Sequence, residues 1–442
     1  MRRLVVGMLA FLGLTALVLV LPVYAAPGPE AEPVTTSTAE VPMGSVTTPA
    51  PEAEVRSGTT DPVAGVPATT PALTVSQTGA DPFSLVGVTW RLDPAVTDTV
   101  VQIRVQDAGG VWGAWTEVAV EDAEQNRGAV TGDEVRGGTT PLWTGRSTAV
   151  EAELVTRSGA RPTDVRLELV DPGTSPADSA LETPDLGDTA HAATAMPPVY
   201  SRAQWGADES IMGWTPQYAG TLKAATVHHT DTANSYTADD VPGIIRSIYA
   251  YHAQSRGWGD IGYNVLVDKF GRLWEGRAGG LSRPVVAAHA GGFNSGTFGV
   301  SMLGNHATVA PTPAELDSLA AAVAWKFSLH GVDPRGTTVL TSGGGGTSRY
   351  AAGVKVTLPT VFGHRDVGNT TCPGDAGYAR LGTLRDLVAS RLSAPLSPIA
   401  TRYTADAALR SSLGSEDIDL PDEIRTALDE VSSPQPGYPE RT

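Results

Sequence analysis

The stretch Gly363-His364-Arg365-Asp366-Val367-Gly368-Asn369-Thr370-Thr371-Cys372-Pro373-Gly374 holds the only cysteine of this 442-residue chain. One cysteine cannot form a disulfide within the chain, and most free cysteines are buried, inert thiols. The alternative is a metal ligand, because His364 lies nearby and Val227-His228-His229-Thr230 ends an apolar run upstream. A thiolate and two imidazoles can hold Zn²⁺ and leave a fourth position for water. The surrounding sequence has to decide between the two interpretations.

Composition limits the class of protein. The chain is 41% hydrophobic and carries a formal charge of −17, so it can build two or three domain cores. This charge argues against a nucleic-acid partner, because phosphate binding needs a basic surface. Disulfide-rich extracellular scaffolds contain many cysteines, so a nearly cysteine-free chain fits a bacterial export product better.

The first 25 residues have the pattern of a signal peptide. Two arginines follow Met1, residues 4–20 are apolar, and Val23-Tyr24-Ala25 offers a cleavage site after Ala25. An uncleaved anchor is the alternative, because the apolar run is nearly long enough to span a bilayer. We expect a secreted protein, extracellular or associated with the cell wall, without stable membrane insertion after cleavage.

Composition then changes several times along the chain. Residues 26–81 are rich in Pro, Thr and Ala, lack aromatic residues, and are predicted to be a disordered linker. Residues 82–172 contain short alternating segments separated by turns, which predicts an all-β, sandwich-like domain of unknown role. Its Trp112, Trp115 and Trp143 are candidates either for the core or for stacking on sugar rings. Residues 173–197 have the composition of a second linker.

The pattern over residues 198–395 is that of an α/β domain, with a mixed central sheet flanked by helices. Strands are predicted at 223–229, 263–268, 272–275, 299–303 and 354–362. Thr312, Pro313 and Glu315 form a helix start with a capping residue, a proline and a glutamate in the expected places. The glycine-rich residues 342–348 are predicted to be a flexible turn. Residues 396–442 are polar, then acidic, and are predicted to be a flexible tail.

Seven short motifs within this domain follow one another in a recognisable order. They are Ser201-Arg202-Ala203-Gln204-Trp205-Gly206-Ala207, Val227-His228-His229-Thr230, Gly257-Trp258-Gly259-Asp260-Ile261-Gly262-Tyr263-Asn264, Trp274-Glu275-Gly276-Arg277, Ala288-His289-Ala290, Phe298-Gly299-Val300-Ser301 and the cysteine-containing stretch quoted first. On these motifs the chain resembles the peptidoglycan recognition protein family, the type-2 N-acetylmuramoyl-L-alanine amidases. The resemblance covers under half of the chain.

The resemblance implies a set of site residues. It makes His228, His364 and Cys372 the zinc ligands, and members lacking the first or last of these bind without cleaving. Tyr263 matches the tyrosine that faces the metal. Thr370 matches the second catalytic position, where phage-type relatives have lysine. His289 and Asn294 are candidates for contact with substrate, although His289 has a structural role as its alternative.

The implied reaction is hydrolysis of the amide between N-acetylmuramic acid and L-alanine. Zinc would activate water and polarise the carbonyl, and Tyr263 with Thr370 would hydrogen-bond the oxyanion or the attacking water. Tyr263, His289 and the metal-activated water all stay candidates for the general base. His229 points to the opposite strand face from His228 and is predicted to be structural.

Two rival functions use the same residues differently. One is a peptidoglycan receptor without catalysis, and the other is a zinc peptidase that cuts the stem peptide, although the chain has no His-Glu-x-x-His motif. Ala278-Gly279-Gly280 follows the Glu-Gly-Arg motif and matches neither stem-peptide class. We expect a monomer whose 198–395 domain folds without the β domain, with peptidoglycan as its partner.

Overall fold

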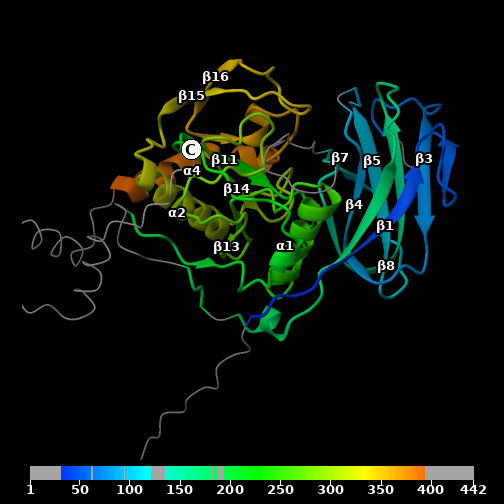
Figure 1. Ribbon diagram of the computed structural model, residues 1–442, viewed down its shortest axis with the longest axis horizontal. Coiled ribbons are helices and arrows are strands. Elements are labelled where there is room, and N and C mark those ends of the chain that lie inside the picture. Colours follow the sequence, from blue (N-terminus) through cyan, green and yellow to red (C-terminus); the bar gives the residue numbers. More distant parts are fainter. Residues whose placement is uncertain are drawn as a thin grey trace, which may run out of the picture.

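The computed structural model describes residues 31–393, apart from 61, 62, 94, 97, 121–134, 182 and 187–193. The predicted signal peptide and acidic tail lie outside the described residues. Figure 1 shows an all-β part next to an α/β part, with helix α1 between the two sheets. This arrangement confirms the predicted fold class.

The β part is a sandwich built from a nine-stranded, antiparallel sheet. The strand order is β1-β9-β4-β8-β3-β2, and β5, β6 and β7 pair alongside. The strands are β1 (Ser37–Gly44), β2 (Ala53–Ser57), β3 (Pro71–Gln77), β4 (Phe83–Arg91), β5 (Thr99–Asp107), β6 (Thr116–Val118), β7 (Arg136–Gly138), β8 (Leu142–Thr156) and β9 (Val165–Asp171). Alternate residues of these strands, such as Ile103 and Leu154, fill one apolar core.

The predicted linker over 26–81 is wrong for the described residues, because β1, β2 and β3 lie within it. These strands contain few large apolar side chains, so their sequence alone cannot build a core. They become stable by pairing, β1 with β9, β3 with β8, and β2 with β3. The predicted linker over 173–197 is also partly ordered. Its short helix Pro176–Ser179 places Asp178 2.7 Å from the buried guanidinium of Arg246.

The α/β part has a six-stranded mixed sheet in the order β10-β13-β12-β14-β11-β17. Its strands are β10 (Val199–Tyr200), β11 (Ala224–His229), β12 (Val265–Val267), β13 (Leu273–Glu275), β14 (Thr297–Met302) and β17 (Val361–Gly363). Only β12 and β13 pair antiparallel, as the predicted hairpin requires. Every residue of β11 and β14 is buried, because helices or loops cover both sheet faces.

Helices pack on both faces of this sheet. One face carries α1 (Val241–Ala250), which continues into a π-helical turn, η3 (Tyr251–Ser255). The other face carries α2 (Pro313–His330) and α4 (Leu381–Ser393), preceded by the short α3 (Asp375–Tyr378). The predicted start of α2 is confirmed, because Thr312 and Glu315 cap each other's backbone N–H groups. The predicted strand at 354–362 is instead two short strands, since β16 (Lys355–Pro359) pairs with β15 (Thr337–Thr341) in a separate hairpin before β17.

The two parts share one apolar core. Leu85, Trp143 and Val170 of the sandwich belong to the same buried cluster as Ile244, Ile245 and Ile248 of α1. The expectation that 198–395 is structurally independent does not agree with this cluster, because removal of the β domain would expose the α1 isoleucines. Trp143 is thereby a core residue, while Trp112 and Trp115 are half-buried and flank the guanidinium of Arg104. None of the helices in the described part of the chain is long and apolar enough to cross a membrane.

Candidate metal centre

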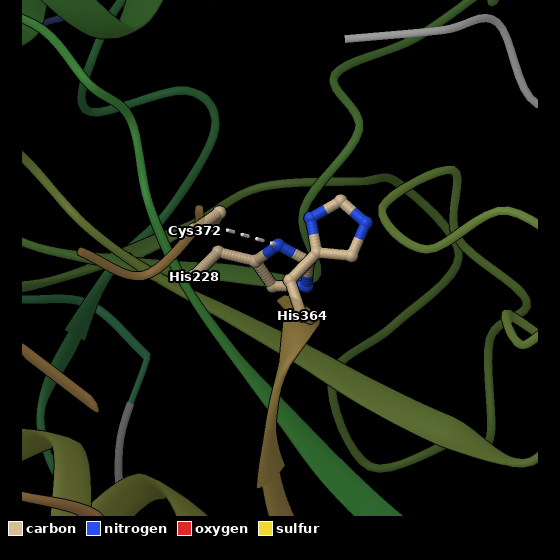
Figure 2. A group of neighbouring side chains, drawn as sticks. All are labelled: His228, His364 and Cys372. Carbon is tan, nitrogen blue, oxygen red and sulfur yellow. Dashed lines mark hydrogen bonds between the residues drawn. The ribbon is translucent and has the colours of Figure 1, made fainter. Parts of the chain in front are cut away.

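Two parallel strands bring the candidate histidines together. The register of β11 and β17 pairs Val227 with Gly363, so His228 in β11 lies beside His364, the first residue after β17. Both imidazoles therefore leave the same edge of the sheet. Cys372 returns to this edge after the loop that begins at His364, and one ligand atom from each of the three residues lies within 4.8 Å of the others. Figure 2 shows these side chains converging.

The chemistry of this group fits a zinc ion. All three side chains are buried, and the His228 Nδ1 atom lies 3.7 Å from Cys372 Sγ. Among the described residues, His364 Nε2 is buried and has no hydrogen-bond partner, as expected of a metal-ligating nitrogen. Burial lowers the pKa of His364 to about 4 and holds the pKa of His228 well below its usual value. Both imidazoles are therefore neutral at pH 7, which is the form that ligates metals.

A chain of hydrogen bonds fixes the orientation of His228. Its Nε2 lies 3.0 Å from His289 Nδ1, and His289 Nε2 lies 3.4 Å from Thr297 Oγ1. The Thr297 hydroxyl donates to the Phe293 carbonyl at 2.6 Å. If His228 Nδ1 holds the metal, its Nε2–H donates to His289, which then donates to Thr297. The His289 imidazole thus orients His228, a role that a carboxylate or a backbone carbonyl usually has beside a ligand histidine.

The loop that carries His364 and Cys372 is held at several points. The Arg365 N–H donates to the Cys372 carbonyl at 2.9 Å, and the Cys372 N–H donates to Thr370 Oγ1 at 3.1 Å. Asp366 accepts from the Gly363 N–H at 2.9 Å. These contacts set the separation of the two ligands before any metal binds, and they hold the Thr370 hydroxyl at the backbone N–H of Cys372.

Tyr263 precedes β12, and its ring lies beside that of His228. Its ring centroid is 5.4 Å from that of His228, and its side chain is buried. The preceding residue, Gly262, is fixed on both sides, because its carbonyl accepts from the Ala288 N–H and its N–H donates to His252 Nδ1. The tyrosine implied by the resemblance is therefore next to the ligand group.

The two predicted substrate contacts have protein partners of their own. Both ring nitrogens of His289 face partners within the protein, which favours an orienting role. The Asn294 Oδ1 atom accepts from the backbone N–H groups of His289 and Ala290, at 2.8 Å each. Its Nδ2 is buried and has no hydrogen-bond partner among the described residues. Substrate contact by either residue stays a prediction.

His229 and His252 do not belong to the candidate ligand group, because each contacts other parts of the protein. The His229 ring accepts from the His306 N–H at 3.0 Å, on the opposite side of β11 from His228, as strand alternation predicts. His252 is buried, and its ring is tilted by 31° against the Trp258 ring with centroids 4.5 Å apart. No sequence pattern would have shown the contact of His252 with Gly262, because that contact depends on the turn between them.

Comparison with known proteins agrees with this fold. Residues 33–184 match the family described as Rv3811 N-terminal galactose-binding domain-like, and residues 218–375 match the N-acetylmuramoyl-L-alanine amidase family. The first match also places the start of the β domain well before residue 82. The α/β part is thus an amidase-family domain. The chain belongs to the peptidoglycan recognition protein family, the type-2 N-acetylmuramoyl-L-alanine amidases.

Relatives include both recognition proteins and amidases. The chain is 34% identical over 178 residues to peptidoglycan-recognition protein SC2 of Drosophila simulans, covering 40% of this chain and 80% of that protein. It is 30% identical over 208 residues to human N-acetylmuramoyl-L-alanine amidase, covering 47% of this chain and 31% of that protein. Among solved structures, wild-type Drosophila PGRP-LB has 25% identity and a TM-score of 0.33, covering 41% of this chain and 91% of that one.

Proposed function

We propose that this protein hydrolyses the amide bond between N-acetylmuramic acid and L-alanine in peptidoglycan, with Zn²⁺ as cofactor. The observation that carries the proposal is the buried group of His228, His364 and Cys372, with ligand atoms within 4.8 Å of one another. Relatives named as amidases support the reaction, and relatives named as recognition proteins support the substrate.

Each residue at the site would have a distinct role in the proposed reaction. A bound zinc ion would supply a Lewis acid for the scissile carbonyl and for water. His228, His364 and Cys372 would hold the ion, and His289 would keep the His228 ring in one orientation and one tautomer. Tyr263, beside His228, is the proposed donor to the oxyanion that develops at the carbonyl. Thr370 holds Cys372 through its hydroxyl oxygen, which leaves its proton available for the same oxyanion.

A binding protein without catalysis is the main alternative. Such a protein needs shape and hydrogen bonds but no metal ligands, so it has no use for a buried thiol between two neutral imidazoles. The retained three-residue group therefore favours catalysis. We also propose that the protein acts outside the cytoplasm as a monomer, on the basis of residues 1–25 and of its expected wall substrate.

Metal dependence tests the proposal. The full-length protein, loaded with zinc, is incubated with soluble muropeptides, with and without a chelator, and zinc is measured in the purified protein. The proposal predicts about one zinc per chain, cleavage of the substrate, and loss of cleavage with chelator that added zinc restores. Binding of muropeptide without cleavage by the zinc-loaded protein would establish the receptor alternative.

A further inference from the structure

The π-helical turn η3 (Tyr251–Ser255) lies at the contact between the two parts of the protein. The buried Tyr251 hydroxyl donates to the Thr139 carbonyl of the β domain at 2.9 Å. Its ring lies against Gly87 of β4, where an added Cβ atom would come within 2.5 Å of the ring. Glycine at this position is thus what allows β4 to approach the turn so closely.

The residue that follows the turn is tied to the same place. Arg256 is fully buried and its Nη1 donates to the Thr139 carbonyl at 2.9 Å. The Arg136 N–H of β7 donates to the Arg256 carbonyl at 3.1 Å. The β domain therefore holds the turn at its first residue and just after its last, through groups that are buried and cannot exchange these bonds for water.

His252 extends from this turn toward the metal centre. Its Nδ1 accepts from the Gly262 N–H at 3.1 Å, and its ring lies edge-on to the Tyr263 ring with centroids 5.8 Å apart. Tyr263 in turn lies 5.4 Å from His228. Burial, with Arg256 and Arg277 nearby, holds the pKa of His252 well below its usual value, so the ring is neutral and keeps its acceptor. Contacts are thus continuous from β4 and β7 to the ligand group.

We propose that His252 is a positioning residue for Tyr263, and that the N-terminal β domain fixes His252 in place through the turn. The inference rests on the proposed function, in which Tyr263 acts on the reacting carbonyl. A displacement of about 1 Å in such a group can cost up to ~100-fold in rate. On this account the β domain is a structural part of the amidase centre, in addition to any role in wall binding.

A double-mutant cycle in the full-length protein tests the link. His252→Leu removes the acceptor for Gly262 and should lower kcat by ~10–100-fold, with zinc content and KM nearly unchanged. In the Tyr263→Phe background the same change should cost little more, because the hydroxyl it positions is gone. His252→Asn offers an oxygen acceptor and should recover most of the rate. Equal losses in both backgrounds, or no loss in either, would overturn the proposal.

The contribution of the β domain is tested by Gly87→Ala, whose Cβ atom must displace the Tyr251 ring. Gly113→Ala in the same domain is the matched control, because its Cβ atom would meet only one atom at an ordinary 3.6 Å. Gly87→Ala should lower kcat in the wild-type background and much less in Tyr263→Phe, while Gly113→Ala should leave both unchanged. Equal rate losses from Gly87→Ala in the two backgrounds would show that the β domain acts on folding alone.

A spectroscopic measurement keeps this inference separate from the proposed function. The Tyr263 ring resonance in ¹³C-tyrosine-labelled protein is assigned from its absence in Tyr263→Phe. His252→Leu should shift this resonance, while His252→Asn should leave it near its original position. This result is expected whether or not the protein cleaves muropeptides, and an unmoved resonance in His252→Leu would refute positioning. A wild-type protein that binds zinc without cleavage would instead refute the proposed function.

Discussion

His228 Nε2 lies 3.0 Å from His289 Nδ1, while the other ring nitrogen of His228 faces Cys372 Sγ at 3.7 Å. The ring that would hold the metal is therefore oriented by a second imidazole. His289→Ala should weaken zinc binding by ~10–100-fold, because outer partners of this kind set the tautomer and orientation of a ligand. Competition with a chromophoric chelator measures the affinity, and an unchanged affinity would remove His289 from this role.

Substitution of a ligand should have a larger effect. Cys372→Ser replaces the thiolate by a hydroxyl that stays protonated at neutral pH, so zinc binding and hydrolysis should both be lost, as in His228→Ala. His229→Ala is the control, because that ring lies on the other side of β11. Metal analysis of the three variants checks the assignment, which fails if His229→Ala loses zinc while His228→Ala keeps it.

Tyr263→Phe isolates one hydroxyl beside the ligand group. Packing of the buried ring is kept, so the fold and the zinc content should be unchanged. Loss of a donor to an oxyanion typically lowers turnover by ~10²–10³-fold, and we expect a loss of that size in kcat. Steady-state kinetics on soluble muropeptide is the measurement. Near-normal turnover would exclude Tyr263 from the mechanism.

Glu168 makes stability depend on pH. Its carboxyl is 1% exposed and accepts from the Thr89 hydroxyl, and burial raises its pKa from 4.5 to about 7. The folded state therefore holds a proton that the unfolded state has released, so stability falls as pH rises from about 4.5 through 7. Glu168→Gln should stabilise the protein by on the order of 3 kcal/mol at pH 8 and hardly at all at pH 4.5.

Denaturant unfolding at the two pH values measures this difference. The exposed Glu117 of β6 supplies the control, and Glu117→Gln should change stability little at either pH. A Glu168→Gln gain that is the same at pH 4.5 and pH 8 would show that the carboxyl is not protonated in the folded protein.

Trp143 tests whether the two parts form one cooperative unit. The indole is 8% exposed and packs in the cluster that contains the isoleucines of α1. Trp143→Ala should cost ~3–5 kcal/mol, and both parts should still unfold in a single calorimetric transition. Trp112→Ala, at a half-buried position outside this cluster, should cost less. Two separate transitions in the wild-type protein would contradict the shared core.

The sequence predicted the metal centre better than the domain boundaries. The three candidate ligands stand in short motifs at one strand end and in one loop, and the family resemblance on those motifs implied them. The β1, β2 and β3 strands could not be predicted, because their stability comes from distant partners, as far as 134 residues away for Ser37 and Asp171. Thr74, for example, pairs with Glu153 of β8.

The contact between the β part and the α/β part could not be predicted from the sequence either. The apolar side of α1 and the outward residues of β4 each fit an ordinary domain core, and nothing in either pattern indicates that they face each other. The same holds for His252, whose acceptor role follows from the π turn. Local patterns thus predicted most elements of the α/β part and the family resemblance implied the ligands, while the contacts between elements depend on the folded chain.

The central claim is hydrolysis of one particular bond, and mass spectrometry of a digest by the zinc-loaded, full-length protein tests it most directly. The account predicts two products from a muropeptide: a free stem peptide beginning at L-alanine, and a muramic acid glycan that has gained the carboxylate. Fragments cut within the stem peptide would identify a peptidase and contradict the account, and an intact muropeptide would leave only binding.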